Sequence, residues 1–195
     1  RREFRRPDDA EDLGDLRAIP DLGTAAAEGV APLDVYLFVD FRSLASRAAF
    51  HILAGMRNHP KHPVRLHVAS MASSAEPAVT ASGAAFVAAH RLGKGISAAK
   101  ALFALSDPND WRHLRRMWTR IGLSRKVLQA HVTHPGTKAA SATVERLVRV
   151  FEMDRDPVIY LRDRRYVGPI DEARIERSIT FLHASLHASQ KEPKP

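Results

Sequence analysis

Two serines three residues apart are the first candidates for chemistry in this chain, in the stretch Asp40-Phe41-Arg42-Ser43-Leu44-Ala45-Ser46. A serine hydroxyl becomes a nucleophile only when a general base takes its proton. Asp40 and His51 are the only nearby candidates, and His51 follows Ser43 by eight residues, about two helical turns, so we expect it to point elsewhere. Serine before an apolar run instead predicts that Ser43 caps the N-terminus of a helix. We therefore assign no catalytic residue among Ser43, Leu44, Ala45 and Ser46.

A basic stretch is the second feature, because no Asp or Glu occurs from Trp111 to Val144. The basic residues that we assign to a partner surface are Arg112, Arg115, Arg116, Arg120, Arg125 and Lys126. The pattern indicates either a positive surface for an acidic partner or a solvated helix face. Trp111 and Trp118 are seven residues apart, which places both on one helix face and favours core packing. Nucleic-acid binding is not expected, since no motif accompanies this stretch.

The ten histidines include two closely spaced pairs that could suggest a metal site. His59 and His62 form one pair, and His131 and His134 form the other. A His-x-x-His pair on a helix can bind a metal ion. However, the first pair lies among prolines, the second runs into a proline, and no acidic residue accompanies either pair. We expect no metal ion and no cofactor.

Composition limits the number of domains and the kinds of chemistry that the chain can support. The chain has 195 residues and a net charge of +8, and 45% of it is hydrophobic, which suits one domain with an arm or an elaboration. It has no cysteine, which excludes thiol redox chemistry, disulfides and thiolate metal sites. No apolar run reaches the roughly 18 to 20 residues of a membrane span. The stretch from Arg1 to Ala10 is charged and shows no signal peptide, and a chain from which a signal peptide had been removed would look the same.

Periodicity and helix-breaking residues predict strands at both ends of a helical middle. The expected strands are Leu33–Phe41, Val64–Ser70, Val158–Leu161 and Arg165–Val167. The expected helices are 43–56, Ser82–Leu92, Ile96–Leu105, 108–121, Ser124–His131, Lys138–Met153 and 171–186. A helix that joins two strands implies a parallel pair, and the late hairpin adds antiparallel strands. The order β-α-β, helices, β-β-α thus predicts an α/β fold, with helices on both faces of a mixed sheet.

This organisation divides the chain into four parts. Residues 1–32 form an N-terminal arm with a short helix or strand near Leu13–Ile19. The core consists of two segments, residues 33–76 and 138–188, and residues 77–137 between them form a helical insertion. Residues 189–195 form a polar tail.

The order of elements resembles the DsbA-like thioredoxin family, which carries Asp-aromatic-x-Cys-Pro-x-Cys after its first core strand. Here Ser43 and Ser46 hold both cysteine positions, and Leu44 holds the proline position. Asp156-Pro157-Val158 matches the family's cis-proline before a strand. The resemblance covers roughly 33–186. It implies a DsbA-like thioredoxin fold with a helical insertion and no redox centre, in which Asp156, Pro157 and Val158 face the capped helix and dock peptides.

Three functions follow from this resemblance. We expect a non-catalytic protein-binding or scaffolding module, such as a periplasmic subunit of a bacterial cell-envelope secretion or conjugation assembly, whose partners contact the basic insertion and the arm. One alternative is a glutathione-binding transferase or isomerase, because the motif of the kappa class resembles Asp-x-x-Ser-Pro-x-Ser and would use Ser43. The 114 residues from Ser43 to Pro157 are few for that class. The other alternative is a Cys-to-Ser variant of an active thiol–disulfide oxidoreductase.

Overall fold

A computed structural model describes residues 16, 19–23, 30–71, 81–151, 153, 156–162 and 164–191 of the chain, the last five by their backbone alone. The short element expected near Leu13–Ile19 lies mostly outside these residues.

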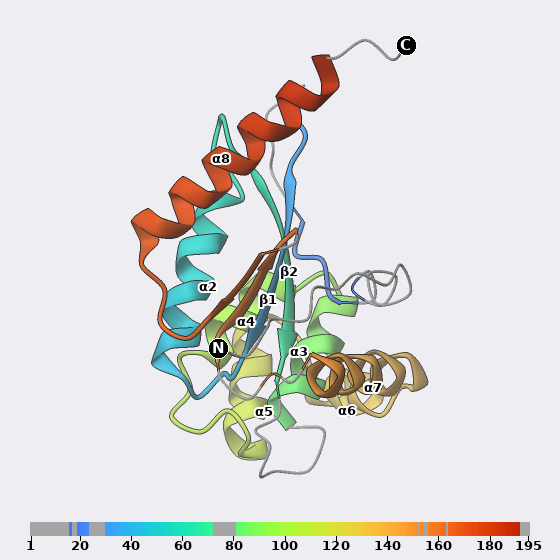
Figure 1. The fold of residues 1–195 in the computed structure, drawn as a ribbon. Coiled ribbons are helices and arrows are strands. Elements are labelled where there is room, and N and C mark those ends of the chain that lie inside the picture. Colours follow the sequence, from blue (N-terminus) through green and yellow to red (C-terminus); the bar gives the residue numbers. More distant parts are fainter. Residues whose placement is uncertain are drawn as a thin grey trace.

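The centre of the fold is a four-stranded sheet in the order β2-β1-β3-β4 (Figure 1). Its strands are β1 (Leu33–Val39), β2 (Val64–Ser70), β3 (Val158–Leu161) and β4 (Arg164–Val167). β1 pairs parallel with β2 and antiparallel with β3, and β3 pairs antiparallel with β4. This is the mixed sheet that the sequence predicted.

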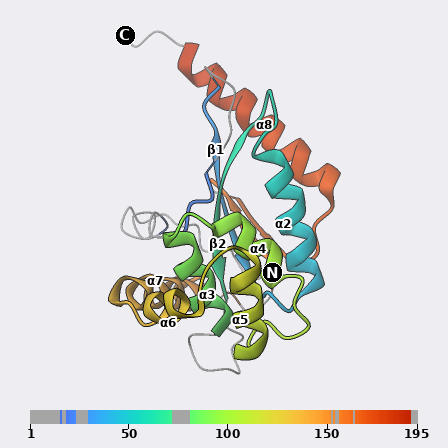
Figure 2. The same cartoon turned by 180° about the vertical axis from the view of Figure 1, so that it is seen from behind.

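Seven helices accompany the sheet within the described residues. They are α2 (Leu44–Met56), α3 (Ala81–Arg91), α4 (Gly95–Leu102), α5 (Trp111–Arg120), α6 (Arg125–Val132), α7 (Pro135–Val150) and α8 (Glu172–Lys191). α2 connects the parallel strands, and α3 to α7 follow one another between β2 and β3. Figures 1 and 2 show α2 and α8 on one side of the sheet and α6 and α7 on the other.

Alternating side chains of the strands fill two cores, as the pleat of a strand requires. Leu37 of β1 and Ile159 of β3 belong to a large core that also includes residues of α2 to α6 and α8. Phe38 and Tyr160, their neighbours in sequence, belong to a smaller core with residues of α7. Helices α3 to α6 therefore share one continuous core with the sheet.

Residues 19–22 run along the outer edge of β2. The Leu22 amide donates to the Leu66 carbonyl at 2.7 Å, and the Val68 amide donates to the Pro20 carbonyl at 3.0 Å. Ile19 and Leu22 are buried. These residues of the expected arm are therefore an extension packed against the domain.

Two helix starts differ from the sequence prediction. α5 begins at Trp111 and not near residue 108, because the Asp110 side chain caps it by accepting from the Arg112 amide. α7 begins at Pro135, three residues before the expected start at Lys138. Proline suits the first helical position, where its missing N–H would have no partner in any case. No helix among the described residues has the length and hydrophobicity needed to cross a membrane.

Candidate functional site

Ser43 caps the N-terminus of α2. Its backbone is extended, with φ −88° and ψ 129°, and its Oγ accepts a hydrogen bond from the Ser46 amide at 3.2 Å. This satisfies one of the amides that the first turn of a helix leaves without a partner. The predicted cap is confirmed, so the hydroxyl at the first motif position has a structural role.

Ser46, one turn later, links the start of α2 to the end of β1 and to the distant loop before β3. Its side chain is fully buried. Its Oγ accepts from the Asp40 amide at 3.2 Å and donates to Oδ2 of Asp156 at 2.8 Å. The single hydroxyl proton is thus directed at a carboxylate 110 residues away in sequence. The sequence identified Ser46 only as a motif position and gave no sign of this bridge.

The Ser46–Asp156 pair has the hydrogen-bond distance of a nucleophile and its base, but it lacks access. Ser46 has no exposed surface, so a substrate cannot reach its oxygen without a rearrangement of α2. The other nearby carboxylate, on Asp40, is engaged by Arg42 through a backbone hydrogen bond at 2.8 Å and an ion pair at 2.9 Å. The geometry therefore supports a closed structural link between Ser46 and Asp156.

The loop opposite Ser46 contains a cis peptide bond between Asp156 and Pro157. The Gly168 amide, just after β4, donates to the Pro157 carbonyl at 2.9 Å and holds the loop against the hairpin. Asp156 is half-buried, whereas Pro157 and Val158 are buried. Of the three residues expected to dock a peptide, only Asp156 exposes its side chain.

Leu44 gives this region an exposed apolar group, with 79% of its surface accessible. It lies between half-buried Ser43 and half-buried Ala45 at the start of α2. The hydrogen bond from Ser46 to Asp156 brings this turn against the Asp156–Pro157 loop. We call Ser43, Leu44, Ala45 and Asp156 the serine-turn surface.

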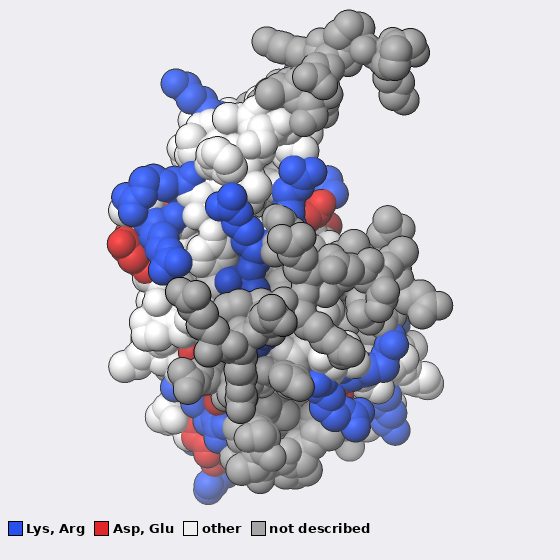
Figure 3. All heavy atoms as spheres, in the orientation of Figure 1, with Lys and Arg blue, Asp and Glu red and all other residues white. Residues whose placement is uncertain are grey.

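The predicted basic residues lie on α5 and α6, and most of them are exposed. Arg112 pairs with Asp110 at 2.9 Å, and this hydrogen bond holds the pKa of Asp110 below its ordinary value. Arg115 is half-buried and donates from Nε to the Trp111 carbonyl at 3.2 Å. Figure 3 shows Lys and Arg side chains at several places on one face and not as a single stripe.

The two tryptophans do not share a core, contrary to the expectation from their spacing. Trp118 is fully buried, whereas Trp111 is 45% exposed. Trp111 is the first residue of α5, and it lines a surface cavity.

The paired histidines contact each other and the main chain. His59 and His62 stack at 5.3 Å between ring centroids, and the His59 ring accepts from the His62 amide at 2.9 Å. No group of three His, Asp or Glu side chains in the described part of the chain could hold a metal ion.

Comparison with known proteins identifies the fold. No protein-family model matches the chain, and no curated protein matches its sequence. Solved structures do match it. The thiol-disulfide exchange protein alpha-DsbA2 from Wolbachia pipientis superposes with a TM-score of 0.70 at 14% identity, covering 90% of this chain and 99% of that one.

Two further solved structures superpose equally well on this chain. A periplasmic thioredoxin-like protein from Salmonella enterica serovar Typhimurium gives a TM-score of 0.71 at 14% identity, with 90% and 98% of the two chains covered. The catalytic domain of Proteus mirabilis ScsC gives a TM-score of 0.73 at 13% identity, with 90% and 96% covered. The chain therefore has a DsbA-like thioredoxin fold and lacks the cysteines that thiol–disulfide exchange requires.

Proposed function

We propose that this chain is a non-catalytic protein-binding or scaffolding module that uses the serine-turn surface to dock a segment of its partner. The observation that carries the proposal is the Ser46 hydroxyl, which is buried and hydrogen-bonded on both sides, at the second serine of the motif that resembles the family's redox pair. A group held in this way stabilises the turn and leaves no reactive atom to present.

The exposed Leu44 supports a docking role. Single exposed apolar residues are common on protein surfaces and need no explanation alone. Leu44, however, lies at the turn that Ser46 joins to the loop before β3. A partner segment would place an apolar side chain against the leucine and remove the exposed surface of the leucine from water.

The basic helices supply the second part of the proposal. Arg116, Arg120 and Lys126 are exposed, and the described residues provide no ion-pair partner for them. An acidic protein partner would complement them, and electrostatic attraction would speed its association. A bacterial cell-envelope assembly for secretion or conjugation is the setting we propose, because one similar structure is of a periplasmic protein.

The test is affinity for a purified partner, measured with the full chain. The partner would first be identified by crosslinking in the source cell. Replacing Leu44 with Asp should weaken binding at least tenfold, because a charge would enter the contact. The control is Val150→Asp on α7, which makes the same type of change at a residue that is 39% exposed. Equal binding by the Leu44→Asp variant and the wild type would refute the serine-turn surface.

Two further tests address the basic surface and the arm. Reversing Arg116 and Arg120 to Glu should reduce the association rate and its salt dependence. Truncation of the arm must stop before Leu16, because Leu16 and Ile19 are buried in the smaller core.

The oxidoreductase alternative is tested by the native gene. Serine codons at positions 43 and 46 would leave it without support, whereas cysteine codons there would replace the binding-module proposal.

A further inference from the structure

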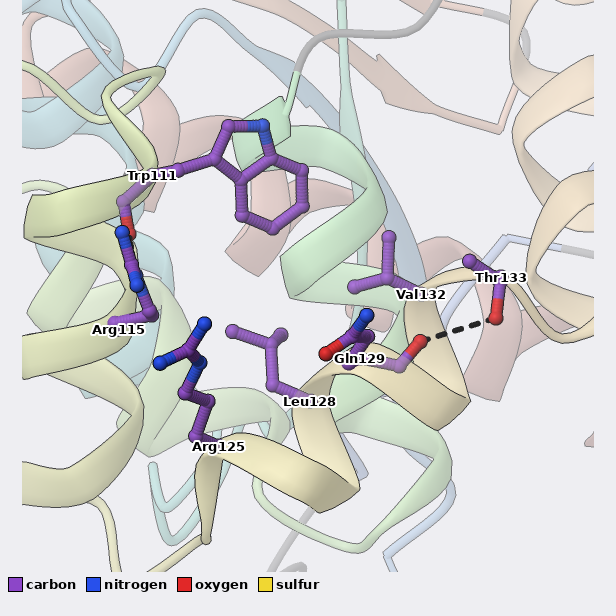
Figure 4. Close-up of a pocket in the computed structure, with 7 residues that line it drawn as sticks. All are labelled: Trp111, Arg115, Arg125, Leu128, Gln129, Val132 and Thr133. Carbon is purple, nitrogen blue, oxygen red and sulfur yellow. Dashed lines mark hydrogen bonds between the residues drawn. The ribbon is translucent and has the colours of Figure 1, made fainter.

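A cavity of about 360 Å³ opens between α5 and α6. Its lining residues are Trp111, Arg115, Arg125, Leu128, Gln129, Val132 and Thr133 (Figure 4). The indole of Trp111 lies across from Leu128, with Val132 farther along α6. The two arginines come from different helices and lie toward the same end of the cavity. The cavity thus combines an apolar part with a cationic end.

The cationic end has no acidic counterpart among the described residues. Arg115 uses its Nε on the Trp111 carbonyl, and neither Arg115 nor Arg125 forms an ion pair with a described side chain. The sequence has no Asp or Glu from Trp111 to Val144, and nearby Asp110 is paired with Arg112. Two guanidinium groups beside an apolar surface, with no carboxylate to neutralise them, favour an anionic ligand.

We propose that this cavity binds a carboxylate that carries an aromatic or branched apolar body. A guanidinium group can donate two parallel hydrogen bonds to a carboxylate, so Arg125 would hold the acid group and Arg115 would add charge. The ligand body stacks on the Trp111 indole and contacts Leu128 and Val132. The Gln129 side-chain amide offers a further polar contact, while the main-chain carbonyl of Gln129 already accepts from Thr133 Oγ1 at 3.0 Å.

The volume limits the ligand to a small one. Binding cavities for small molecules range from roughly 300 to 1,000 Å³, and this one is near the lower end. It suits one aromatic ring with a short acid chain. Such a group has two sources, namely a free aryl carboxylate or the C-terminal phenylalanine of a peptide, and both present the same chemistry.

Intrinsic fluorescence provides the readout. The chain has two tryptophans, and Trp118 is fully buried, so a change caused by a ligand in the cavity reports on Trp111. The probes are 3-phenylpropionate, its neutral amide, phenyl phosphate, and an acetylated tripeptide that ends in phenylalanine with a free carboxylate. Calorimetry provides an independent measure of affinity. We expect 3-phenylpropionate to bind at least tenfold more tightly than the amide.

Arg125→Gln is the decisive variant, and it should weaken binding of the carboxylate at least tenfold. Arg116→Gln makes the same change at an exposed residue of α5 outside the cavity, and it should stay within twofold of wild type. Thermal unfolding would show that both variants are folded. Since both residues are exposed, we expect both variants to fold. Val132→Ala, at a half-buried lining residue, tests the apolar contact, because it should weaken binding of the acid and of the amide alike.

Each result of the binding experiments either identifies the source of the ligand or overturns the proposal. Tightest binding by the free acid assigns the cavity to a small molecule, and a tenfold gain for the tripeptide assigns it to a chain end. No binding at millimolar concentration, equal binding of acid and amide, or an Arg125→Gln variant that binds normally would overturn the proposal. Tighter binding of phenyl phosphate would overturn the carboxylate assignment. None of these results depends on the serine-turn surface, whose own test changes Leu44.

Discussion

Replacing Ser46 with Ala removes the bridge between α2 and the Asp156–Pro157 loop. The Ser46 hydroxyl donates to the Asp156 carboxylate at 2.8 Å, and a hydrogen bond to a charged group contributes about 1.5–3 kcal/mol. The same oxygen accepts from the Asp40 amide at 3.2 Å, and this neutral hydrogen bond contributes about 1 kcal/mol. Asp156 is half-buried, so water recovers part of the first term. The expected loss is therefore about 2–3 kcal/mol of the free energy of unfolding, which is a large share of the roughly 5–15 kcal/mol typical of a domain.

The assay is urea unfolding followed by circular dichroism, with the m-value checked for constancy. A double-mutant cycle with Asp156→Ala isolates the pair, and its coupling energy should be about 1–2 kcal/mol. The control is Ser43→Ala, which removes only the helix cap, should cost about 1 kcal/mol and should add independently to Asp156→Ala. A loss below about 0.5 kcal/mol for Ser46→Ala, or a coupling energy near zero, would refute the structural role that we assign to the hydroxyl.

Three other outcomes are expected. Burial holds the pKa of His90 below its ordinary 6.5, so the unfolded chain takes up the proton first. The stability that His90 contributes is therefore complete above pH 6.5 and is lost as the pH falls through the lowered pKa. The urea concentration at the midpoint of unfolding should therefore differ less between pH 7.5 and pH 5.5 in His90→Gln than in the wild type. Leu44→Asp should change the free energy of unfolding by no more than about 0.5 kcal/mol, because the side chain is exposed, and a larger loss would mean that Leu44 packs in the fold. Glutathione at millimolar concentration should give no heat in calorimetry, and binding that Ser43→Ala abolishes would restore the transferase alternative.

The sequence predicted the central strands well. β2 and β3 have the predicted bounds, and β1 ends two residues before the predicted end, because Phe41 and Arg42 form a turn. These strands are short apolar runs bounded by residues that disfavour a strand, so the local pattern determines them. The Ser43 cap was also predictable, because a cap depends on neighbours within three residues.

Features that depend on distant residues were not predictable. The Ser46–Asp156 bond joins residues 110 apart, and no periodicity reports such a contact. Trp111 was expected in the core because of its helical spacing from Trp118, but spacing cannot show that the first residue of α5 is exposed while Trp118, two turns later, is fully buried. Pro135 was interpreted as an end because proline breaks helices, although it also starts them.

The pairing of residues 19–22 with β2 bears on how the chain avoids self-association. A bare sheet edge offers unpaired amides and carbonyls to any other strand, and proteins commonly cover such edges. Here the Pro20 carbonyl and the Leu22 amide occupy the outer side of β2. A chain shortened past Leu22 would therefore present a new strand-pairing site, and we expect it to form dimers or aggregates even where the remaining domain folds. The segment serves as a built-in cover, and expression studies of this domain should retain it.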